Sequence, residues 1–365
     1  MEAIAESDEL SSTIAAGIAE QGAAHASLAR MRLAFMRGSC TIMNIGHSVT
    51  EGASATGSGL RWTDKLRDSL RGLLGISGGG LNYFPATGGS YPALLPSNWT
   101  VTAGTANAGG SGEGVGRYAR AMTTSSKLSL TFTGTSIRLF FTSYSGGPTV
   151  TVTIDGSPVA SFSAASGSTS YVGSTTYSGL SAGSHTIELT NTGAQFNFQG
   201  AIVYNGDETS GVRVINAGHS GDQVSNIMGV SPLTRQTSLW TALAPDLVTI
   251  EYGINEYRNN TPVATFKTNL TNMVAALETA IGHSAIVIVI DYQATHATTP
   301  VAAWSAYKDA MREVAAENGL PVVDLSTIST LGIGQSGMNG DNIHPNDAGH
   351  LAIANLVSAS LLAYV

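Results

Sequence analysis

The sequence of 365 residues is poor in cysteine and in charge. A single cysteine, Cys40, rules out an intramolecular disulfide. Asp, Glu, Lys and Arg make up 12% of the residues, where about 25% is usual. The net charge of −8 argues against a nucleic-acid partner, which usually requires a basic surface. The longest aliphatic stretch, residues 285–290, is far too short to span a bilayer, so we expect no membrane segment.

What the sequence does contain is glycine and small polar residues. Hydrophobic residues make up 42% of the chain, enough for a large core, and there are 43 glycines. The surface must therefore consist mostly of Ser, Thr, Asn, Gly and Ala, as is common in secreted and virion-surface proteins. The N-terminus opens with acidic residues and shows no secretory signal. We expect an extracellular or virion-associated protein.

The N-terminal segment, residues 1–37, is rich in alanine and predicts a helix. Leu10, Ile14 and Ile18 are spaced by four residues and would share one helical face. Such a helix could join subunits of a homo-oligomer or tether the protein. It could equally pack on its own domain, and the sequence leaves these alternatives open.

Two segments, residues 38–82 and 209–365, predict one α/β domain. Residues 40–45, 212–216, 246–252, 285–291 and 321–325 are strand-like, whereas residues 60–74, 233–243, 262–281, 301–318 and 345–362 have helical character. This alternation favours a flavodoxin-like, three-layer α/β/α fold with a parallel sheet. Cys40, in the first strand, should be a buried and inert thiol.

The segment between them, residues 83–208, lacks a helical period. Short alternating runs at residues 127–133, 137–141, 150–154, 185–189 and 200–204 are separated by turn signals such as Asp155-Gly156. This pattern predicts an antiparallel β-sandwich inserted into the α/β domain. Four of its aromatic residues could form a sugar-binding platform or could be sandwich core: Trp99, Tyr144, Tyr171 and Tyr177.

The segment from Asn44 to Gly52 contains the most informative residue, Ser48. It lies between a predicted core strand and the next helix, where open α/β sheets place their chemistry. A serine nucleophile needs a base and an oxyanion site. The alternative is a turn serine or a helix cap.

A candidate base follows near the C-terminus, in Gly340-Asp341-Asn342-Ile343-His344-Pro345. Histidine is suited to take a serine proton near neutral pH, and Asp341 could hold the His344 imidazole in the required tautomer. A metal site is an alternative, because Asp341, His344, Asp347 and His350 are evenly spaced. We expect no metal, since Asp347 and His350 should lie along a helix, and no cofactor is implied.

Two further segments should end at the same edge of the sheet. Gly218 follows the second α/β strand, and Asn255 follows the third. A backbone N–H and an asparagine amide can stabilise an oxyanion. His47 and His219 could line the pocket or bond to a neighbouring loop, and Glu251, in a predicted buried strand, needs a partner.

Serine, glycine, asparagine and histidine in this order, each at the end of an element, resemble the SGNH (GDSL-type) hydrolase superfamily. The resemblance covers about residues 38–80 and 210–365. It implies Ser48 as nucleophile and oxyanion donor, Gly218 and Asn255 as further donors, and His344 and Asp341 as base and partner. The first block differs, because His47 replaces the usual aspartate before the serine. The third block has Glu256 where an aspartate is usual.

The insert resembles the galactose-binding-like jelly rolls found beside many carbohydrate esterases, through residues 132–139, 150–156 and 180–187. Together the resemblances imply a serine esterase that removes a short acyl group, most often O-acetyl, from a carbohydrate or polysaccharide. A phage tail deacetylase is one such setting. Alternatives are a lipase, thioesterase or acyltransferase of the same superfamily, and a non-catalytic carbohydrate-binding or virion adhesion protein.

Overall fold

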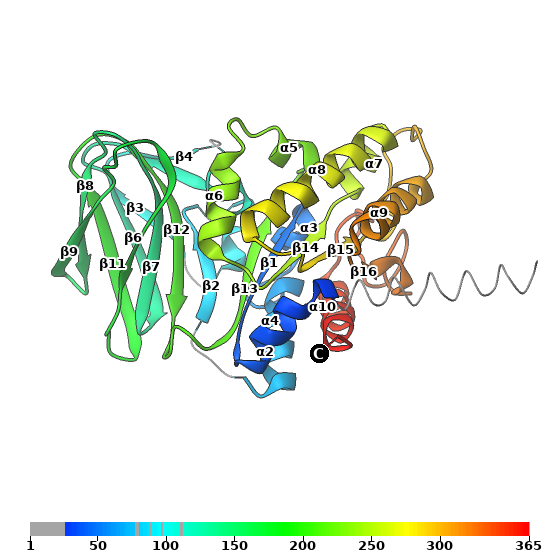
Figure 1. The fold of residues 1–365 in the computed structure, drawn as a ribbon, viewed down its shortest axis with the longest axis horizontal. Coiled ribbons are helices and arrows are strands. Elements are labelled where there is room, and N and C mark those ends of the chain that lie inside the picture. Colours follow the sequence, from blue (N-terminus) through cyan, green and yellow to red (C-terminus); the bar gives the residue numbers. More distant parts are fainter. Residues whose placement is uncertain (1–25, 77–79, 88, 96–97, 110–111, 365) are drawn as a thin grey trace, which may run out of the picture.

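The computed structural model describes residues 26–76, 80–87, 89–95, 98–109 and 112–364. A five-stranded parallel sheet forms its centre (Figure 1). Its strands, in spatial order, are β13 (Gly211–Gly218), β1 (Ser39–Gly46), β14 (Leu247–Glu251), β15 (Ile286–Ile290) and β16 (Val322–Asp324). Numbered along the α/β pattern, this order is 2-1-3-4-5. It is the flavodoxin-like order, so the predicted fold class is confirmed.

Helices cover both faces of this sheet (Figure 1). One face carries α2 (Ala29–Met36), α4 (Trp62–Leu74) and α10 (Asp347–Leu362). The other carries α6 (Thr234–Leu243), α8 (Val263–Ile281) and α9 (Trp304–Asn318). Short helices α3 (Ser48–Glu51), α5 (Val224–Met228) and α7 (Ile254–Arg258) follow strand ends or loops. There are also 3₁₀ turns at η1 (Pro92–Leu94), η2 (Val115–Arg117) and η3 (Leu325–Thr327).

Two antiparallel sheets form the second part of the molecule, at the left of Figure 1. The first contains β10 (Ser170–Tyr177), β7 (Ser136–Ser143), β12 (Phe196–Tyr204), β5 (Ala119–Met122) and β4 (Ala106–Gly109), with β2 (Gly80–Pro85) also paired to β12. The second contains β3 (Thr100–Ala103), β6 (Lys127–Gly134), β11 (Gly183–Asn191), β8 (Thr149–Ile154) and β9 (Ser157–Ser163). All of these strands lie between α4 and β13 in the chain, as expected of an inserted β domain.

The described residues form two hydrophobic cores, one around the parallel sheet and one between the antiparallel sheets. The five strands of the parallel sheet are almost wholly buried because helices cover both of its faces. A separate cluster, which includes Trp99, Leu130 and Phe198, fills the space between the two antiparallel sheets. Phe140 and Tyr204 of the insert belong instead to the core of the α/β part, so the insert is packed against that part. Cys40 is buried as expected, and burial raises the pKa of its thiol.

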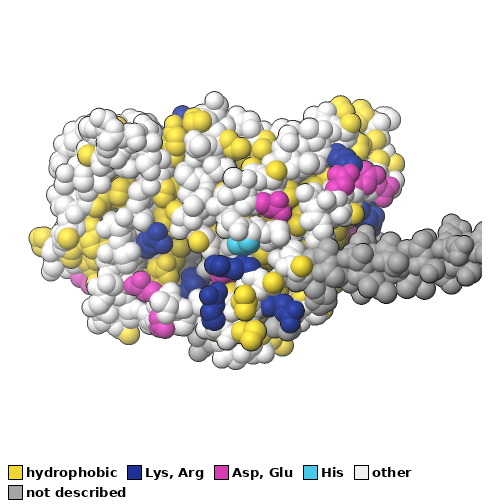
Figure 2. All heavy atoms as spheres, in the orientation of Figure 1, with side chains coloured by type: hydrophobic (Ala, Val, Ile, Leu, Met, Phe, Trp, Pro, Cys, Tyr) yellow, Lys and Arg dark blue, Asp and Glu magenta, His cyan; other side chains and the backbone are white. Residues whose placement is uncertain are grey.

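The surface agrees with the low charge of the sequence. Most of the face in Figure 2 is formed by uncharged polar side chains and backbone, with charged side chains in a few small groups. Among the described residues, no helix combines the length and apolar character needed to cross a bilayer. Most of the predicted N-terminal helix, residues 1–25, lies outside the described residues, and its role in oligomerisation stays a prediction. Residues 29–36 are helical as α2 and pack beside β1.

Candidate active site

Ser48 is the first residue of α3, directly beyond the carboxyl end of β1. The strand ends at Gly46, which is in register with Gly218 of β13 and with Glu251 of β14. A side chain at Gly46 would overlap the hydroxyl of Thr50, so the chain can turn this tightly only with glycine. The helix ends one turn later at Gly52, whose φ of 112° lies in the left-handed region. The sequence therefore presents Ser48 on a short, sharply bounded turn.

Ser48, His344 and Asp341 are joined by hydrogen bonds, although Ser48 is nearly 300 residues from the other two. The Ser48 Oγ lies 2.9 Å from His344 Nε2. The other ring nitrogen, Nδ1, lies 2.6 Å from Asp341 Oδ2. This geometry suits a histidine that accepts the serine proton on Nε2 and donates its Nδ1–H to the carboxylate.

The turn that carries Asp341 and His344 is fixed by its own backbone. Asp341 Oδ1 accepts the N–H groups of Ile343 at 2.9 Å and His344 at 3.0 Å. Partial burial disfavours the ionised carboxyl, but these two bonds and the bond from the His344 ring outweigh it and lower the pKa of Asp341. The Tyr292 hydroxyl donates to the carbonyl of Ile343 at 2.9 Å and ties this turn to the segment after β15. Asp341 is therefore held as an anion beside the imidazole.

Gly218 and Asn255 lie at the same edge of the sheet as Ser48. Gly218 is the last residue of β13, and Asn255 lies in α7, which follows β14. A side chain at Gly218 would overlap the backbone of Glu51, so β13 and α3 touch there. The Gly218 N–H donates to Asn216 Oδ1 at 3.0 Å. Asn255 is nearly buried, and its amide donates to the carbonyl of Asp222 at 2.8 Å. An amide carries two N–H donors, so this bond orients Asn255 and leaves it a second donor.

The insert contributes contacts to the site that the sequence did not indicate. Glu51, one turn after Ser48, accepts the Ser90 N–H at 2.7 Å and the Tyr118 hydroxyl at 2.8 Å through one oxygen. Its other oxygen accepts the Ser220 N–H at 2.6 Å. Burial raises the pKa of Glu51, and these hydrogen bonds oppose that rise. One buried carboxyl thus links the nucleophile turn, the insert and the loop after Gly218.

A second link runs from the insert to Asn255. The Arg117 guanidinium forms an ion pair with Asp222, with its Nε 3.0 Å from Oδ2. Asp222 in turn offers its carbonyl to the Asn255 amide. No pattern in the sequence pointed to Arg117, because its partner is 105 residues away.

The three residues whose roles the sequence left open all make specific contacts. His219 bonds through Nδ1 to the carbonyl of Gly116 at 2.5 Å and stacks on Tyr118, with ring centroids 4.4 Å apart. Glu256 accepts the N–H groups of Val224 at 2.6 Å and Gly253 at 3.0 Å. His47 is fully buried and bonds through Nε2 to Asp291 at 2.9 Å. The histidines bond to neighbouring loops, and Glu256 joins the starts of α5 and α7.

The evenly spaced acidic and histidine residues near the C-terminus do not converge. Asp347 accepts the backbone N–H of Thr56, and His350 bonds to the carbonyl of Ala53. Burial lowers the pKa of His350 to about 4. Among the described residues, the group whose ligand atoms are close enough to hold a metal ion is a different one, namely His47, Glu251 and Asp291.

The aromatic residues considered as a sugar platform are occupied in packing. Trp99 lies in the sandwich core against Phe198, and Tyr177 is buried. Tyr144 donates its hydroxyl to the carbonyl of Gln195, and the Arg235 guanidinium lies over the ring of Tyr171. These four side chains therefore do not form an exposed aromatic surface.

Comparison with known proteins bears on the family of the α/β part. Residues 174–352 match the model of the GDSL-like Lipase/Acylhydrolase family. This part of the chain is therefore similar to GDSL-like hydrolases. The matched range includes Gly218, Asn255, Asp341 and His344, whereas Ser48 is supplied by the part of the chain before the insert. The resemblance to SGNH hydrolases that the sequence indicated is confirmed.

Solved structures with this fold include a peptidoglycan O-acetylesterase, with a TM-score of 0.68 and 17% identity, covering 93% of this chain and 96% of that one. A family two carbohydrate esterase from Clostridium thermocellum is also similar, with a TM-score of 0.35, 16% identity and coverage of 68% and 95%. No curated protein matches the sequence. The likeness to the first structure extends over nearly the whole chain, so it includes the insert as well as the α/β part.

Proposed function

We propose that the protein is a serine esterase that removes short acyl groups, in particular O-acetyl groups, from a carbohydrate. The observation that carries the proposal is the unbroken hydrogen-bond chain from the Ser48 hydroxyl through His344 to Asp341. A serine, a base and an orienting carboxylate in this geometry form the arrangement used for acyl transfer. The family match of the surrounding domain supports the same reaction class.

In the proposed mechanism, the Ser48 oxygen attacks the ester carbonyl while His344 takes its proton. Asp341 keeps the Nδ1–H of His344 in place and stabilises the imidazolium. The proton then passes to the leaving alcohol, and Ser48 is left as an acyl ester. A water molecule activated by His344 hydrolyses this ester, releases the acid and restores Ser48. The reaction needs no cofactor.

The negative oxygen of the tetrahedral intermediate needs donors. We assign the backbone N–H groups of Ser48 and Gly218 and the second N–H of the Asn255 amide to this role. The Gly218 N–H now donates to Asn216, so the substrate oxygen must share or replace that bond. Arg117 and Asp222 support the orientation of Asn255 from the insert.

A polymeric, acetylated substrate is favoured by two observations. The side chains of His344 and Asp341 are 22% and 38% exposed, so the site is open at the surface and can admit an ester on a bulky chain. The structure with a TM-score of 0.68 is described as a peptidoglycan O-acetylesterase. With its low-charge surface, such an enzyme would suit an extracellular or virion-associated setting, and a phage tail is one example.

The test is ester hydrolysis by the wild type and by Ser48→Ala. Rates on p-nitrophenyl acetate, butyrate and octanoate report the acyl-length preference, and acetate release from an acetylated polysaccharide reports the natural type of substrate. We expect acetate to be preferred and Ser48→Ala to be inactive. Preference for octanoate would favour a lipase, and product formation only with an added alcohol would favour an acyltransferase. Glycan binding unchanged in Ser48→Ala, with no turnover by either protein, would favour an adhesin.

A further inference from the structure

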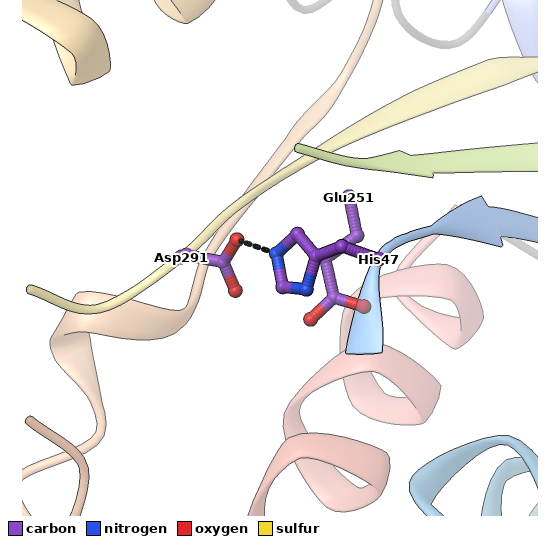
Figure 3. Close-up of side chains that lie close together, drawn as sticks. All are labelled: His47, Glu251 and Asp291. Carbon is purple, nitrogen blue, oxygen red and sulfur yellow. Dashed lines mark hydrogen bonds and ion pairs between the residues drawn. The ribbon is translucent and has the colours of Figure 1, made fainter. Parts of the chain in front are cut away.

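A second cluster of titratable side chains lies behind Ser48. His47, Glu251 and Asp291 are each 0% exposed. His47 follows β1, Glu251 ends β14 and Asp291 follows β15, so the three come from neighbouring strands of the sheet. Their side chains point toward one another (Figure 3). None of them belongs to the hydrogen-bond chain of Ser48, His344 and Asp341, yet His47 is the residue directly before Ser48.

The hydrogen bonds of His47 fix its tautomer. Its Nδ1 accepts the backbone N–H of Val49 at 3.2 Å, so this nitrogen carries no proton. Its Nε2 lies 2.9 Å from Asp291 Oδ2 and therefore donates. Burial lowers the pKa of His47, against the opposing charges of Glu251, Glu256 and Asp222. The ring is thus neutral, with its proton on Nε2.

A neutral histidine leaves two buried carboxyl groups without a compensating positive charge. Two adjacent carboxylates removed from water cannot both stay ionised, and one keeps a proton. Burial raises the pKa of both Glu251 and Asp291. One oxygen of each carboxyl and one ring nitrogen of His47 all lie within 4.8 Å of one another. Among the described residues, neither Glu251 Oε1 nor Asp291 Oδ1 has a hydrogen-bond donor. One proton between them satisfies both oxygens.

The bonds already made indicate which carboxyl keeps that proton. Asp291 Oδ2 accepts from His47, which favours the anion on Asp291. Glu251 Oε2 accepts from the Thr50 hydroxyl, which leaves its Oε1 free to carry the proton. In this state every polar atom of the cluster has a partner, and the cluster carries one negative charge.

We propose that His47, Asp291 and Glu251 form a proton-sharing chain that positions Ser48 for reaction. Protonated Glu251 donates to Asp291, Asp291 accepts from His47, and His47 holds the Val49 N–H. The proposal rests on the proposed function only in taking Ser48 as the reacting group. His47, Asp291 and Glu251 are positioning residues, since they do not touch the substrate.

The turn around Ser48 has the contacts that such a role requires. His47 is bonded to the end of β15, Val49 to the His47 ring, and Thr50 to the end of β14. The residue before Ser48 and the two after it are therefore each tied to the cluster. A nucleophile displaced by about 1 Å can lose on the order of 10²-fold in rate, so loss of this network should reduce kcat more than it changes KM.

Isosteric amides distinguish the two carboxyl groups. Gln at position 251 can donate its amide N–H to Asp291 and accept from Thr50, as protonated Glu251 does. We expect Glu251→Gln to retain kcat within about threefold, whereas Glu251→Ala should lose about 10- to 100-fold. Asn at position 291 can accept from His47 and donate its amide N–H to Glu251, but Glu251 must then give up its proton, which moves the negative charge away from His47. We expect Asp291→Asn to lose about 10- to 100-fold in kcat with KM nearly unchanged.

Infrared spectroscopy gives a readout that does not depend on activity. The wild type should show the carbonyl band of a buried, protonated carboxyl group at neutral pH, and Glu251→Gln should lack it. Labelling of Ser48 by a fluorophosphonate would report its reactivity without an ester substrate. Labelling should be slow in Asp291→Asn and nearly normal in Glu251→Gln.

The outcomes separate this proposal from the proposed function. The expected band and labelling rates in a protein that hydrolyses no ester would support the positioning chain and count against the esterase. Ester hydrolysis with no such band, or with Glu251→Gln as impaired as Glu251→Ala, would overturn the chain alone. Metal that copurifies in stoichiometric amount with the wild type and is lost in Glu251→Gln would also overturn it, because the cluster would then be a cation site.

Discussion

Two histidine–aspartate pairs lie on either side of Ser48, and they differ mainly in exposure. The His344 and Asp341 side chains are 22% and 38% exposed and 2.6 Å apart. The His47 and Asp291 side chains are both 0% exposed and 2.9 Å apart. The first pair reaches the serine hydroxyl directly, and the second reaches only the backbone and neighbours of the serine.

The two aspartates respond in opposite ways to their surroundings. Backbone N–H groups stabilise the Asp341 anion and lower its pKa despite partial burial. Full burial raises the pKa of Asp291, which shares its site with a second carboxyl. A histidine–aspartate pair can therefore hold a proton that is transferred during the reaction or a proton that stays in place. Solvent access and the neighbouring donors decide which.

Removal of the exposed histidine should have the largest effect on activity. We expect His344→Ala to lower kcat by about 10²–10⁴-fold, the range of general base catalysis. Because the ring is partly exposed and water can replace it as the partner of Ser48 and Asp341, the free energy of unfolding should fall by about 1 kcal/mol or less. Steady-state kinetics and urea unfolding check both parts. A stability loss as large as that of a core substitution would mean that the two pairs are not as different as we infer.

Removal of the buried histidine, His47, should reduce stability more, and kcat less, than removal of His344. His47→Ala leaves Asp291 and the Val49 N–H without their partner inside the core. We expect a loss of about 3 kcal/mol in the free energy of unfolding and a smaller loss of kcat than in His344→Ala. Urea unfolding at matched pH measures the first effect. If His47→Ala is as stable as the wild type, the buried pair does not stabilise the fold more than the pair of His344 and Asp341.

The long elements and the exposed pair could be predicted from the sequence, because their signals are local or repeated. Helix α8 has a clear period, and its observed start is within one residue of the predicted one. Asp341 and His344 are three residues apart, so their proximity follows from the sequence spacing alone. Ser48, Gly218 and Asn255 follow predicted strands, and parallel strands deliver such residues to one edge.

The buried pair could not be predicted in this way. His47 and Asp291 are 244 residues apart, and nothing local reveals that the ring is fully buried. Helices α3, α5 and α7 have four or five residues each, too few to show a period. Their ends are fixed by distant partners, as when Glu256 accepts the Val224 N–H at the start of α5.

A contact from the insert tests whether residues outside the α/β part support the site around Ser48. Arg117→Met removes the charge partner of Asp222, which orients Asn255. We expect kcat to fall about tenfold, equivalent to about 1.4 kcal/mol, within the range for an unpaired buried group. Arg120→Met is a matched control, because Arg120 binds carbonyls within the insert itself. An equal loss of kcat in both variants would point to general damage to the insert.

The smallest expected effect is the pH dependence of stability that Glu251, next to the buried pair, imposes. The native state retains a proton on Glu251 that the unfolded chain loses above a pKa of about 4.3. Because the native state then binds more protons, the free energy of unfolding falls as pH rises, until the raised native pKa is reached. One proton contributes at most about 1.4 kcal/mol per pH unit.

Glu251→Gln cannot release this proton, so its stability should fall less steeply with pH than that of the wild type. The variant retains the other titratable groups around the site, which are Asp291, His47, Glu256, Asp222, Asp324, Tyr252 and Tyr292. Urea unfolding at three or more pH values between about 5.5 and 8 measures the difference. The expected difference in slope corresponds to about one bound proton. Parallel curves for the two proteins would show that Glu251 is ionised in the native state. The cluster of His47, Asp291 and Glu251 would then lack the shared proton that we propose for it.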